Sequence, residues 1–424
     1  MTSELIVLLG DKAIGVVRRD KRGRLKFTYE EEWRTARGAY PLSLSMPLAA
    51  SEHGHAAIEA FLWGLLPDNE FVLGKWAQKF QVSARNAFAL ISNVGEDCAG
   101  AVQFVRPDRL ETVLENRSGA IEWIDEAGIA SRLRDLRVDN SAWRRPADTG
   151  QFSLAGAQPK TALYFMDDRW GVPSGRTPTT HILKPPTGEF DGYAENEHFC
   201  LMLARELGLP TASSSIQRFG SELAIVLERY DRRTVDGQII RVHQEDICQA
   251  LSVLPTRKYQ NEGGPGVPQI YELLHAVSGA PREDVETFIN AVIFSWLIGG
   301  TDAHAKNYSI LIGAGGRARL APLYDLASAL PYDGLQFQKL KLAMKVGDEY
   351  KLQDIGVKQW KDLAGQIKTP EDKVIQQAAS MVDNMPDACA TVREILARQQ
   401  LTHPVIDKTS AAISARAEQM KSIF

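Results

Sequence analysis

The chain has 424 residues, of which 44% are hydrophobic and 24% are charged, and its formal net charge is −4. This length and composition predict two or three globular domains with sizeable hydrophobic cores. The small acidic surplus argues against a free-standing nucleic-acid-binding protein, because such proteins usually carry a basic surplus.

The beginning of the chain alternates short apolar runs with polar residues, at 5–9, 13–17 and 25–29, around a helical pattern at 58–66. This alternation predicts a small, mostly β module that ends near residue 108 and contains one or two helices. The first residues indicate a strand rather than a signal peptide, because no small-residue cleavage site follows them. No apolar run reaches 18 residues, so we expect no transmembrane helix.

Three regions follow in chain order. Residues 109–150 form a charged connecting segment with a helical pattern at 127–136, residues 151–243 are rich in strand patterns, and helical patterns dominate 244–424. Glycine and proline residues at 261–268 predict an exposed loop. The expected fold class is therefore α+β, with a largely helical C-terminal part.

A run of small residues, Ala155, Gly156 and Ala157, joins a polar turn to an apolar strand pattern. Small residues let backbone N–H groups approach phosphate oxygens closely, and Lys160 adds positive charge. The run is not a Walker A loop, because Pro159 stands where that motif has its second glycine. Taken alone, the segment also fits a hairpin turn of small residues.

Lys184 ends a strand pattern at 179–184 and is followed by two prolines. A lysine at the end of a buried strand can reach the α- and β-phosphates of ATP, as the strand lysine of protein kinases does. A helical pattern begins about ten residues later, and Glu195 or Glu197 in its first turn is a candidate partner for Lys184. An exposed strand-end lysine, and acids that only complement the helix dipole, explain the same residues.

An apolar strand pattern at 224–228 runs into a charged turn that contains Arg229 and Tyr230. In a kinase this is the place where the lobes meet and backbone groups bind the edge of adenine. The backbone of Glu228 and Tyr230 is the candidate for that contact, and an ordinary charged turn has the same pattern.

The most informative residues are Asp302 and Asn307, which lie between an apolar helical pattern at 288–298 and a strand pattern at 308–312. In a phosphoryl-transfer loop, the aspartate accepts the proton of the attacking hydroxyl and the asparagine oxygen binds Mg²⁺. Asp325 follows a further strand pattern and is the candidate for a second metal ligand. A polar turn after a buried helix explains the first pair equally well when it is read alone.

The cysteines and histidines indicate no further metal site. No additional His, Cys or acid at ligand spacing joins His304 and Asp302. We expect reduced thiols of a cytoplasmic protein, since no C-x-x-C pair occurs among the four cysteines: Cys98, Cys200, Cys248 and Cys389.

These motifs together resemble the HipA family of bacterial serine/threonine kinase toxins. The most specific match is Thr301-Asp302-Ala303-His304-Ala305-Lys306-Asn307. The resemblance extends, in the same order, over most of the chain, through 41–48, 65–69, 95–102, 153–160, 179–184, 228–231, 244–249, 301–307 and 324–325.

The resemblance implies a two-lobed protein-kinase-like fold with ATP between the lobes. It divides the chain into a HipA-type N-terminal module (1–108), a connecting segment (109–150), a nucleotide-binding lobe (151–243) and a helical catalytic lobe (244–424). It makes Asp302 the catalytic base, and Asn307 and Asp325 the Mg²⁺ ligands. The residues that it assigns to ATP binding are Ala155, Gly156, Ala157, Gln158, Pro159, Lys160, Lys184, Glu228, Arg229, Tyr230, His304, Ala305, Lys306, Asn307, Tyr324 and Asp325.

One residue departs from the family pattern. Pro159 stands where we associate a glutamate with this loop. Because proline has no N–H, the loop offers one phosphate contact fewer there.

The resemblance also implies regulation and partners. Ser153 matches the family's autophosphorylated serine, whose modification displaces the phosphate loop and switches the kinase off. The family arrests growth and is linked to persistence, and its targets include an aminoacyl-tRNA synthetase, typically the glutamyl one. Its partner is a HipB-like helix-turn-helix antitoxin, which holds the complex on operator DNA. We expect four lysines to form a solvated helix face that touches DNA only within such a complex: Lys358, Lys361, Lys368 and Lys373.

An alternative function is a small-molecule phosphotransferase of the aminoglycoside or choline kinase type, which shares the catalytic-loop logic. Such an enzyme for cationic substrates needs an acidic pocket, and the helical patterns at 269–290 and 373–398 carry no dense acid cluster. A catalytically dead binding partner is disfavoured, because every base and metal position is filled.

Overall fold

The computed structural model describes residues 3–115, 119–143, 145, 152–186, 188 and 190–424. Most of the polar stretch at 144–150 in the predicted connecting segment lies outside these residues. The chain divides into two compact units that alternate along the sequence. The first contains 1–185, 218–256 and 309–318, and the second contains 186–217, 257–308 and 319–424. The predicted boundaries at 108, 150 and 243 follow chain order and stay predictions.

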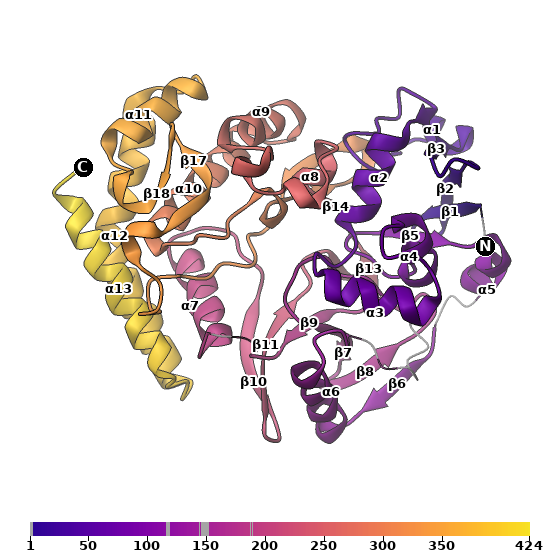
Figure 1. The fold of residues 1–424 in the computed structure, drawn as a ribbon, viewed down its shortest axis with the longest axis horizontal. Helices are drawn as coiled ribbons and strands as arrows, with labels where there is room; N and C mark the ends of the chain where they lie inside the picture. The colour runs from indigo at the N-terminus through magenta and orange to yellow at the C-terminus, as the bar shows by residue number, and fades with distance from the viewer. Residues whose placement is uncertain (1–2, 116–118, 144, 146–151, 187, 189) are drawn as a thin grey trace. The chain divides into compact units, whose positions relative to one another are not determined.

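The N-terminal part of the first unit contains an antiparallel five-stranded sheet of order β4-β3-β2-β1-β5. Its strands are β1 Glu4–Leu9, β2 Lys12–Arg19, β3 Leu25–Tyr29, β4 Glu52–His53 and β5 Val102–Val105. The helices α1 Glu31–Thr35, α2 His55–Gly64, α3 Glu70–Phe80 and α4 Ala87–Val94 belong to the same part of the chain (Figure 1).

The prediction of one or two helices in this module was wrong. Two of the helices begin at asparagine caps, which are local signals that the apolar pattern did not reveal. Asn69 accepts hydrogen bonds from the N–H groups of Phe71 and Val72, and Asn86 accepts one from Ala89.

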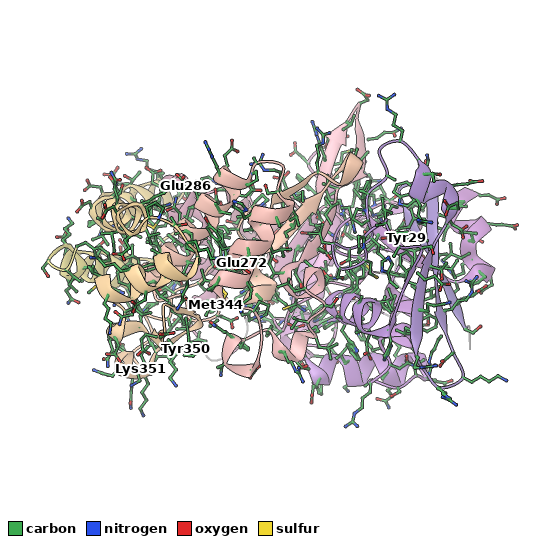
Figure 2. All side chains as sticks on the ribbon, turned by 90° about the horizontal axis from the view of Figure 1, so that it is seen from above. Tyr29, Glu272, Glu286, Met344, Tyr350 and Lys351 are labelled. Carbon is green, nitrogen blue, oxygen red and sulfur yellow. The ribbon has the colours of Figure 1, made fainter. Side chains whose placement is uncertain are left out.

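A buried tyrosine links the sheet to the loop that follows it. Figure 2 labels this residue, Tyr29. Its hydroxyl donates to the Met46 carbonyl at 2.6 Å and accepts from the Leu42 N–H at 2.8 Å. Burial raises the pKa of Tyr29, so the hydroxyl remains a neutral donor. The core around it continues into Phe152 and Leu154. The N-terminal module and the predicted phosphate loop therefore share one hydrophobic core.

A second sheet carries the predicted lysine and hinge, in the order β10-β11-β9-β7-β8-β6. Helix α6, Glu126–Val138, packs on it through Ile129 and Leu133, close to the predicted 127–136. The strands are β6 Ile121–Ile124, β7 Thr161–Met166, β8 Arg169–Pro173, β9 His181–Lys184, β10 Ser214–Phe219 and β11 Glu222–Glu228. Further elements are α5 Leu110–Glu115, β12 Arg232–Val235, β13 Gln238–Arg241, β14 His243–Asp246, α8 Ile247–Ala250, β15 Ser309–Ile312 and β16 Ala318–Leu320.

The second unit is mainly helical. Its central helix α10, Pro281–Ile298, is buried along most of its length, and α13 runs beside α12 (Figure 1). The other elements are α7 Tyr193–Glu206, α9 Val267–Val277, α11 Val357–Gln366, α12 Glu371–Arg398, α13 Pro404–Lys421, β17 Lys341–Val346 and β18 Glu349–Lys351. The predicted loop at 261–268 is partly regular, because a 3-10 turn ends at Glu262 and α9 begins at Val267.

The mixture of helices and sheets in two compact units confirms the predicted α+β class. No helix in the described part of the chain is both long enough and apolar enough to cross a membrane.

Candidate active site

The predicted phosphate loop is bonded to the N-terminal module. The Ser153 N–H donates to the Asp97 carbonyl at 2.9 Å, and the Ser153 hydroxyl donates to the Leu65 carbonyl at 2.7 Å. The Gly156 carbonyl accepts a hydrogen bond from the Asp68 N–H at 3.2 Å. Ser153 is fully buried. Hydrogen bonds to the N-terminal module therefore fix the loop at Ser153 and at Gly156.

Lys160 closes this loop on itself. Its ammonium donates to the Ala155 carbonyl at 2.6 Å and lies 5.4 Å from the centre of the Trp143 ring. Gly156 has φ +102°, and a Cβ at this position would lie 2.5 Å from the Lys160 Nζ. The backbone angle favours glycine there, because residues with a Cβ seldom adopt a positive φ of this size.

Lys184 lies where the strand pattern predicted. It is the last residue of β9, it is buried, and it pairs with Ile225 of β11. Glu195 and Glu197 lie in the first turns of α7 in the other unit, and both are buried. One Glu195 oxygen has no hydrogen-bond partner among the described residues. A buried carboxylate needs a cation or a donor, and its pairing with Lys184 stays a prediction.

The predicted hinge begins at Glu228, which is exposed at the end of β11. The next residue, Arg229, uses its N–H to bond the Thr180 carbonyl at 2.9 Å. Its guanidinium is buried against the Asp231 carboxylate at 2.8 Å. The Tyr230 hydroxyl donates to the Gln244 side-chain oxygen at 2.5 Å. The two side chains after Glu228 therefore anchor the hinge in the protein.

Asp97 is a structural centre that the sequence reading did not assign. Its carboxylate lies 3.0 Å from Arg232 and 2.9 Å from Arg241, and it accepts a hydrogen bond from the Thr179 hydroxyl at 2.8 Å. Burial alone raises the pKa of Asp97, but Arg241, Arg232 and Arg229 outweigh it and hold this pKa well below its ordinary value. Asp97 therefore joins the N-terminal module to both the hinge and the strand of Lys184.

The predicted catalytic loop follows α10 in the second unit. The Asp302 side chain is 61% exposed, and its carboxylate accepts a hydrogen bond from the Tyr259 hydroxyl at 2.5 Å. The Asn307 side-chain nitrogen donates to the Asp302 carbonyl at 2.8 Å. This bond orients the amide, so the Asn307 oxygen is the atom left to face a cation. Sequence reasoning missed Tyr259, which lies far from the motif in the chain.

The remaining residues of the motif support this loop. His304 is buried, and its ring lies edge-on to Tyr259, with 4.9 Å between ring centres. The Ala305 N–H donates to the Lys258 carbonyl at 3.3 Å. The Lys306 carbonyl accepts a hydrogen bond from the Tyr324 hydroxyl at 2.7 Å. This last bond ties the catalytic loop to the segment that carries Asp325.

Asp325 has φ +58°, in the left-handed region that a non-glycine residue seldom adopts. Such strain persists only where neighbouring bonds hold it. Leu323 is bonded through its N–H to Pro210 and through its carbonyl to Ala212. Three residues beyond Asp325, the Ser328 carbonyl accepts a hydrogen bond from the Asn196 side-chain nitrogen at 2.8 Å. The Ser328 N–H donates to the Asn196 side-chain oxygen at 3.0 Å.

Asp302 and Asp325 line one cavity of about 300 Å³ in the second unit. Burial raises the pKa of Tyr193, which also lines it, and the charges of Asp325, Glu197 and Asp302 raise it further. The cavity is lined by Phe190, Tyr193, Ser295, Ile298, Gly300, Thr301, Asp302, Ala303, Asp325, Leu326, Ala327, Ser328, Ala329, Tyr332 and Leu335.

The described residues contain no group of three or more His, Cys, Asp or Glu suited to hold a metal by themselves. Mg²⁺ is usually bound by one or two protein groups together with substrate phosphates and water. The oriented Asn307 oxygen and the Asp325 carboxylate fit that donor set. The predicted magnesium ligands are therefore chemically suitable for a nucleotide-bound ion.

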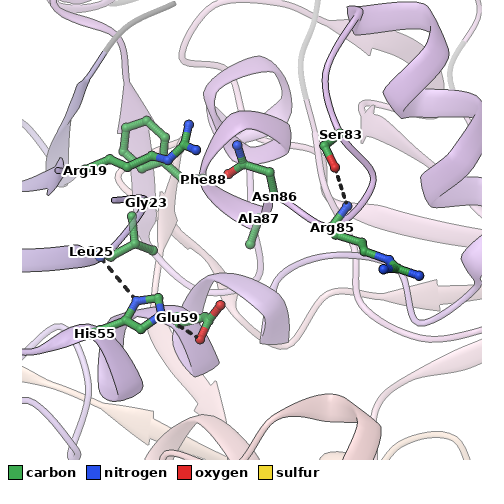
Figure 3. A pocket seen from close by; sticks show the side chains of 10 residues that line it. All are labelled: Arg19, Gly23, Leu25, His55, Glu59, Ser83, Arg85, Asn86, Ala87 and Phe88. Atoms are coloured by element: carbon green, nitrogen blue, oxygen red, sulfur yellow. Dashed lines mark hydrogen bonds and ion pairs between the residues drawn. The ribbon is translucent and has the colours of Figure 1, made fainter. Parts of the chain in front are cut away.

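A second cavity of about 260 Å³ lies in the N-terminal module and contains none of the predicted site residues (Figure 3). Its His55 accepts a hydrogen bond from the Leu25 N–H through Nδ1, and its Nε2 lies 3.2 Å from Glu59. This arrangement places the histidine proton on Nε2.

The four cysteines are buried free thiols, as predicted. Cys200 and Cys248 lie in helices α7 and α8. All four predicted surface lysines are exposed, and two of them pair with acids, Lys361 with Glu371 and Lys373 with Glu286. The prediction of one helix face was wrong, because Lys358 and Lys361 lie on α11, Lys373 lies on α12 and Lys368 lies in the turn between these helices.

The two units, with a small-residue loop and strand lysine in one and an Asp–Asn–Asp set in the other, have the parts of a protein-kinase-like fold. The model of the HipA N-terminal domain matches residues 5–105, and that of the HipA-like C-terminal domain matches 152–389. The chain belongs to the HipA family.

The matches over nearly the whole chain include two relatives and one solved structure. A Sinorhizobium fredii protein named "Putative kinase Y4mE" is 35% identical to this chain. The matched region covers 97% of this chain and 96% of that protein. The serine/threonine-protein kinase toxin HipA of Shewanella oneidensis is 30% identical, and the matched region covers 98% of this chain and 93% of that protein. The structure of the Shewanella oneidensis MR-1 toxin–antitoxin complex of HipA, HipB and operator DNA matches with a TM-score of 0.84 and 26% identity, covering 99% of this chain and 98% of that chain.

Proposed function

We propose that this protein is an ATP- and Mg²⁺-dependent serine/threonine protein kinase that acts as a growth-arresting toxin. The observation that carries the proposal is the geometry around Asp302. Its carboxylate is exposed at a cavity that it shares with Asp325, and its carbonyl orients the Asn307 amide. Family membership and the full-length match to a kinase toxin support the same activity.

In the proposed reaction, Asp302 accepts the proton of the substrate hydroxyl as that oxygen attacks the γ-phosphorus of ATP. The hydrogen bond from Tyr259 holds the carboxylate in place. Mg²⁺, when bound by Asn307 and Asp325, neutralises charge on the nucleotide phosphates. Lys184 and the loop from Ala155 to Lys160 contact those phosphates, the backbone at Glu228–Tyr230 binds adenine, and the backbone of His304–Lys306 and Tyr324 completes the nucleotide site.

We further propose the regulation and partners of a family toxin. Ser153 is the site of inactivating autophosphorylation. A HipB-like helix-turn-helix antitoxin neutralises the protein and carries it to operator DNA, as the complex of the Shewanella protein suggests. The target is an aminoacyl-tRNA synthetase such as the glutamyl one.

The test is to incubate purified protein with γ-labelled ATP, Mg²⁺ and cell lysate, and to identify the labelled species. We expect label on a protein band for the wild-type chain and for the control Asp383→Asn, which changes an exposed aspartate of α12. The Asp302→Asn variant should give none. Label that enters only small molecules would favour the alternative small-molecule phosphotransferase and overturn the proposal.

A further inference from the structure

The cavity beside Asp302 has an aromatic wall that the chemistry of phosphoryl transfer does not use. Phe190 lies 4.6 Å from Tyr332 and 6.4 Å from Tyr193, measured between ring centres. The Tyr332 hydroxyl accepts a hydrogen bond from Asn196 at 3.1 Å. The rings are therefore held in position before any substrate arrives.

The rim of the same cavity exposes large apolar side chains. Phe190 is 37% exposed and Leu335 is 36% exposed, and both line the cavity. Apolar groups gathered at the mouth of a cavity mark a binding surface, whereas single exposed apolar residues are ordinary.

The charges of the lining restrict what this cavity accepts. Asp302 and Asp325 are its charged residues, and no lysine or arginine occurs among the residues that line it. An acidic group would be repelled by both carboxylates. With the two acids engaged in catalysis and metal binding, the remaining walls offer mainly apolar contact. A volume of about 300 Å³ lies at the lower end of the range of ligand pockets, which suits one bulky side chain.

We propose that this cavity binds a large apolar side chain adjacent to the acceptor serine of a protein substrate. The proposal rests on the protein kinase activity proposed above. Because Asp302 lines the cavity, a group that fills it lies next to the hydroxyl that Asp302 deprotonates. The chain itself contains such a segment, Phe152-Ser153-Leu154, in which the proposed self-acceptor has apolar neighbours on both sides.

Two peptides test this specificity. One reproduces residues 149–158, and the other carries Phe152→Ala and Leu154→Ala. With the wild-type enzyme, the value of kcat/KM should fall at least about tenfold for the alanine peptide, as expected when an apolar pocket loses its side chain. A third peptide with Phe152→Glu should be a poorer substrate still. Equal use of the first two peptides would overturn the proposal.

The enzyme variant Phe190→Ala/Leu335→Ala tests whether this cavity causes the difference in kcat/KM between the two peptides. Both side chains are partly exposed, so the fold should tolerate their truncation. In this variant the two peptides should differ by less than about threefold, because the pocket that distinguishes them is lost. The matched control is Phe71→Ala, which removes a phenylalanine that is 56% exposed on α3. This control enzyme should distinguish the two peptides by the same factor as the wild type.

The outcomes separate the two proposals. If peptides are phosphorylated but the cavity variant distinguishes them as the wild type does, the apolar subsite is refuted and the proposed kinase activity is not. Absence of transfer to any peptide or protein would refute the kinase activity and the subsite with it.

Discussion

The Ser153 hydroxyl donates a hydrogen bond to the Leu65 carbonyl, 2.7 Å away, and the whole Ser153 residue is buried. The residue proposed for autophosphorylation is thus held against the N-terminal module in this conformation. A phosphate of roughly −1.5 to −2 charges has no room there. We therefore expect that the loop must leave this place before Ser153 can be phosphorylated, and that the phosphate would then prevent its return.

This relationship gives two different expectations for Ser153. The Ser153→Ala variant leaves the Leu65 carbonyl without its donor and should lower the free energy of unfolding by about 1–3 kcal/mol. The Ser153→Asp variant buries an unpaired charge, so the loop should leave and ATP affinity should fall sharply. Urea unfolding measures the first effect and calorimetric ATP titration measures the second, while mass spectrometry after incubation with Mg-ATP shows whether Ser153 of the wild type is phosphorylated. Normal ATP binding by Ser153→Asp, or no phosphate on Ser153 of the wild type, would contradict the switch.

Asp302→Asn should abolish phosphoryl transfer and leave the fold intact. An amide cannot accept the proton of the attacking hydroxyl, and removing a general base typically costs about 10²–10⁴-fold in rate. The side chain is 61% exposed, so the melting temperature should stay within the range of a surface substitution. Asp383→Asn is the control for both measurements. Near wild-type transfer by Asp302→Asn would remove this residue from the role of base.

Lys184→Ala should weaken ATP binding, because the α- and β-phosphates lose a positive charge at the end of β9. The matched control is Lys358→Ala, which removes an exposed lysine of α11. ATP titration should separate the two variants by about tenfold or more in Kd. Equal affinity and equal turnover in the two variants would exclude Lys184 from the nucleotide site.

Asp97→Asn should destabilise the protein by about 3–5 kcal/mol, because three buried arginines lose a shared carboxylate. The folded-state pKa of Asp97 lies below the ordinary 3.8, so its stabilisation is complete above about pH 4 and is lost as the pH falls further. Urea unfolding at neutral and acidic pH measures this effect. The free energies of unfolding of the variant and the wild type should become similar in acid. A difference in stability that does not depend on pH would refute this role.

Glu245 should show the opposite pH dependence. It is buried on β14 and accepts a hydrogen bond from the Leu44 N–H at 2.7 Å, and burial raises its pKa from 4.5 to about 8. The folded state then binds the extra proton, so this group's contribution to stability is complete below pH 4.5 and declines as the pH rises toward 8.

The Glu245→Gln variant is neutral at every pH and should remove this decline. It should unfold at higher urea concentration than the wild type at about pH 8, and at a similar concentration near pH 5. The control is Glu272→Gln, an exposed residue of α9 (Figure 2). A wild-type stability that stays flat between these two pH values would show that Glu245 is not protonated in the folded state.

The sequence by itself determined the elements that carry the candidate site. The strand that ends at Lys184, the strand that ends at Glu228 and the buried helix before Asp302 all lie close to where the apolar patterns placed them. These features depend on spacing between neighbours in the chain, which a pattern records directly. Family membership also followed from ordered motifs, above all the one that spans Asp302 to Asn307. Helices α3 and α4 were missed, although the buried residues of α3, Val72, Leu73, Trp76 and Ala77, recur at helical spacing.

Only the tertiary structure decided which distant residues support those motifs. Ser153 and Leu65 are 88 positions apart, and Asn196 and Ser328 are 132 positions apart. Nothing in the local pattern around Asp97 indicates that arginines from far along the chain surround it. Hydrogen bonds and ion pairs of this kind depend on how the folded chain brings side chains together, and local spacing carries no record of that.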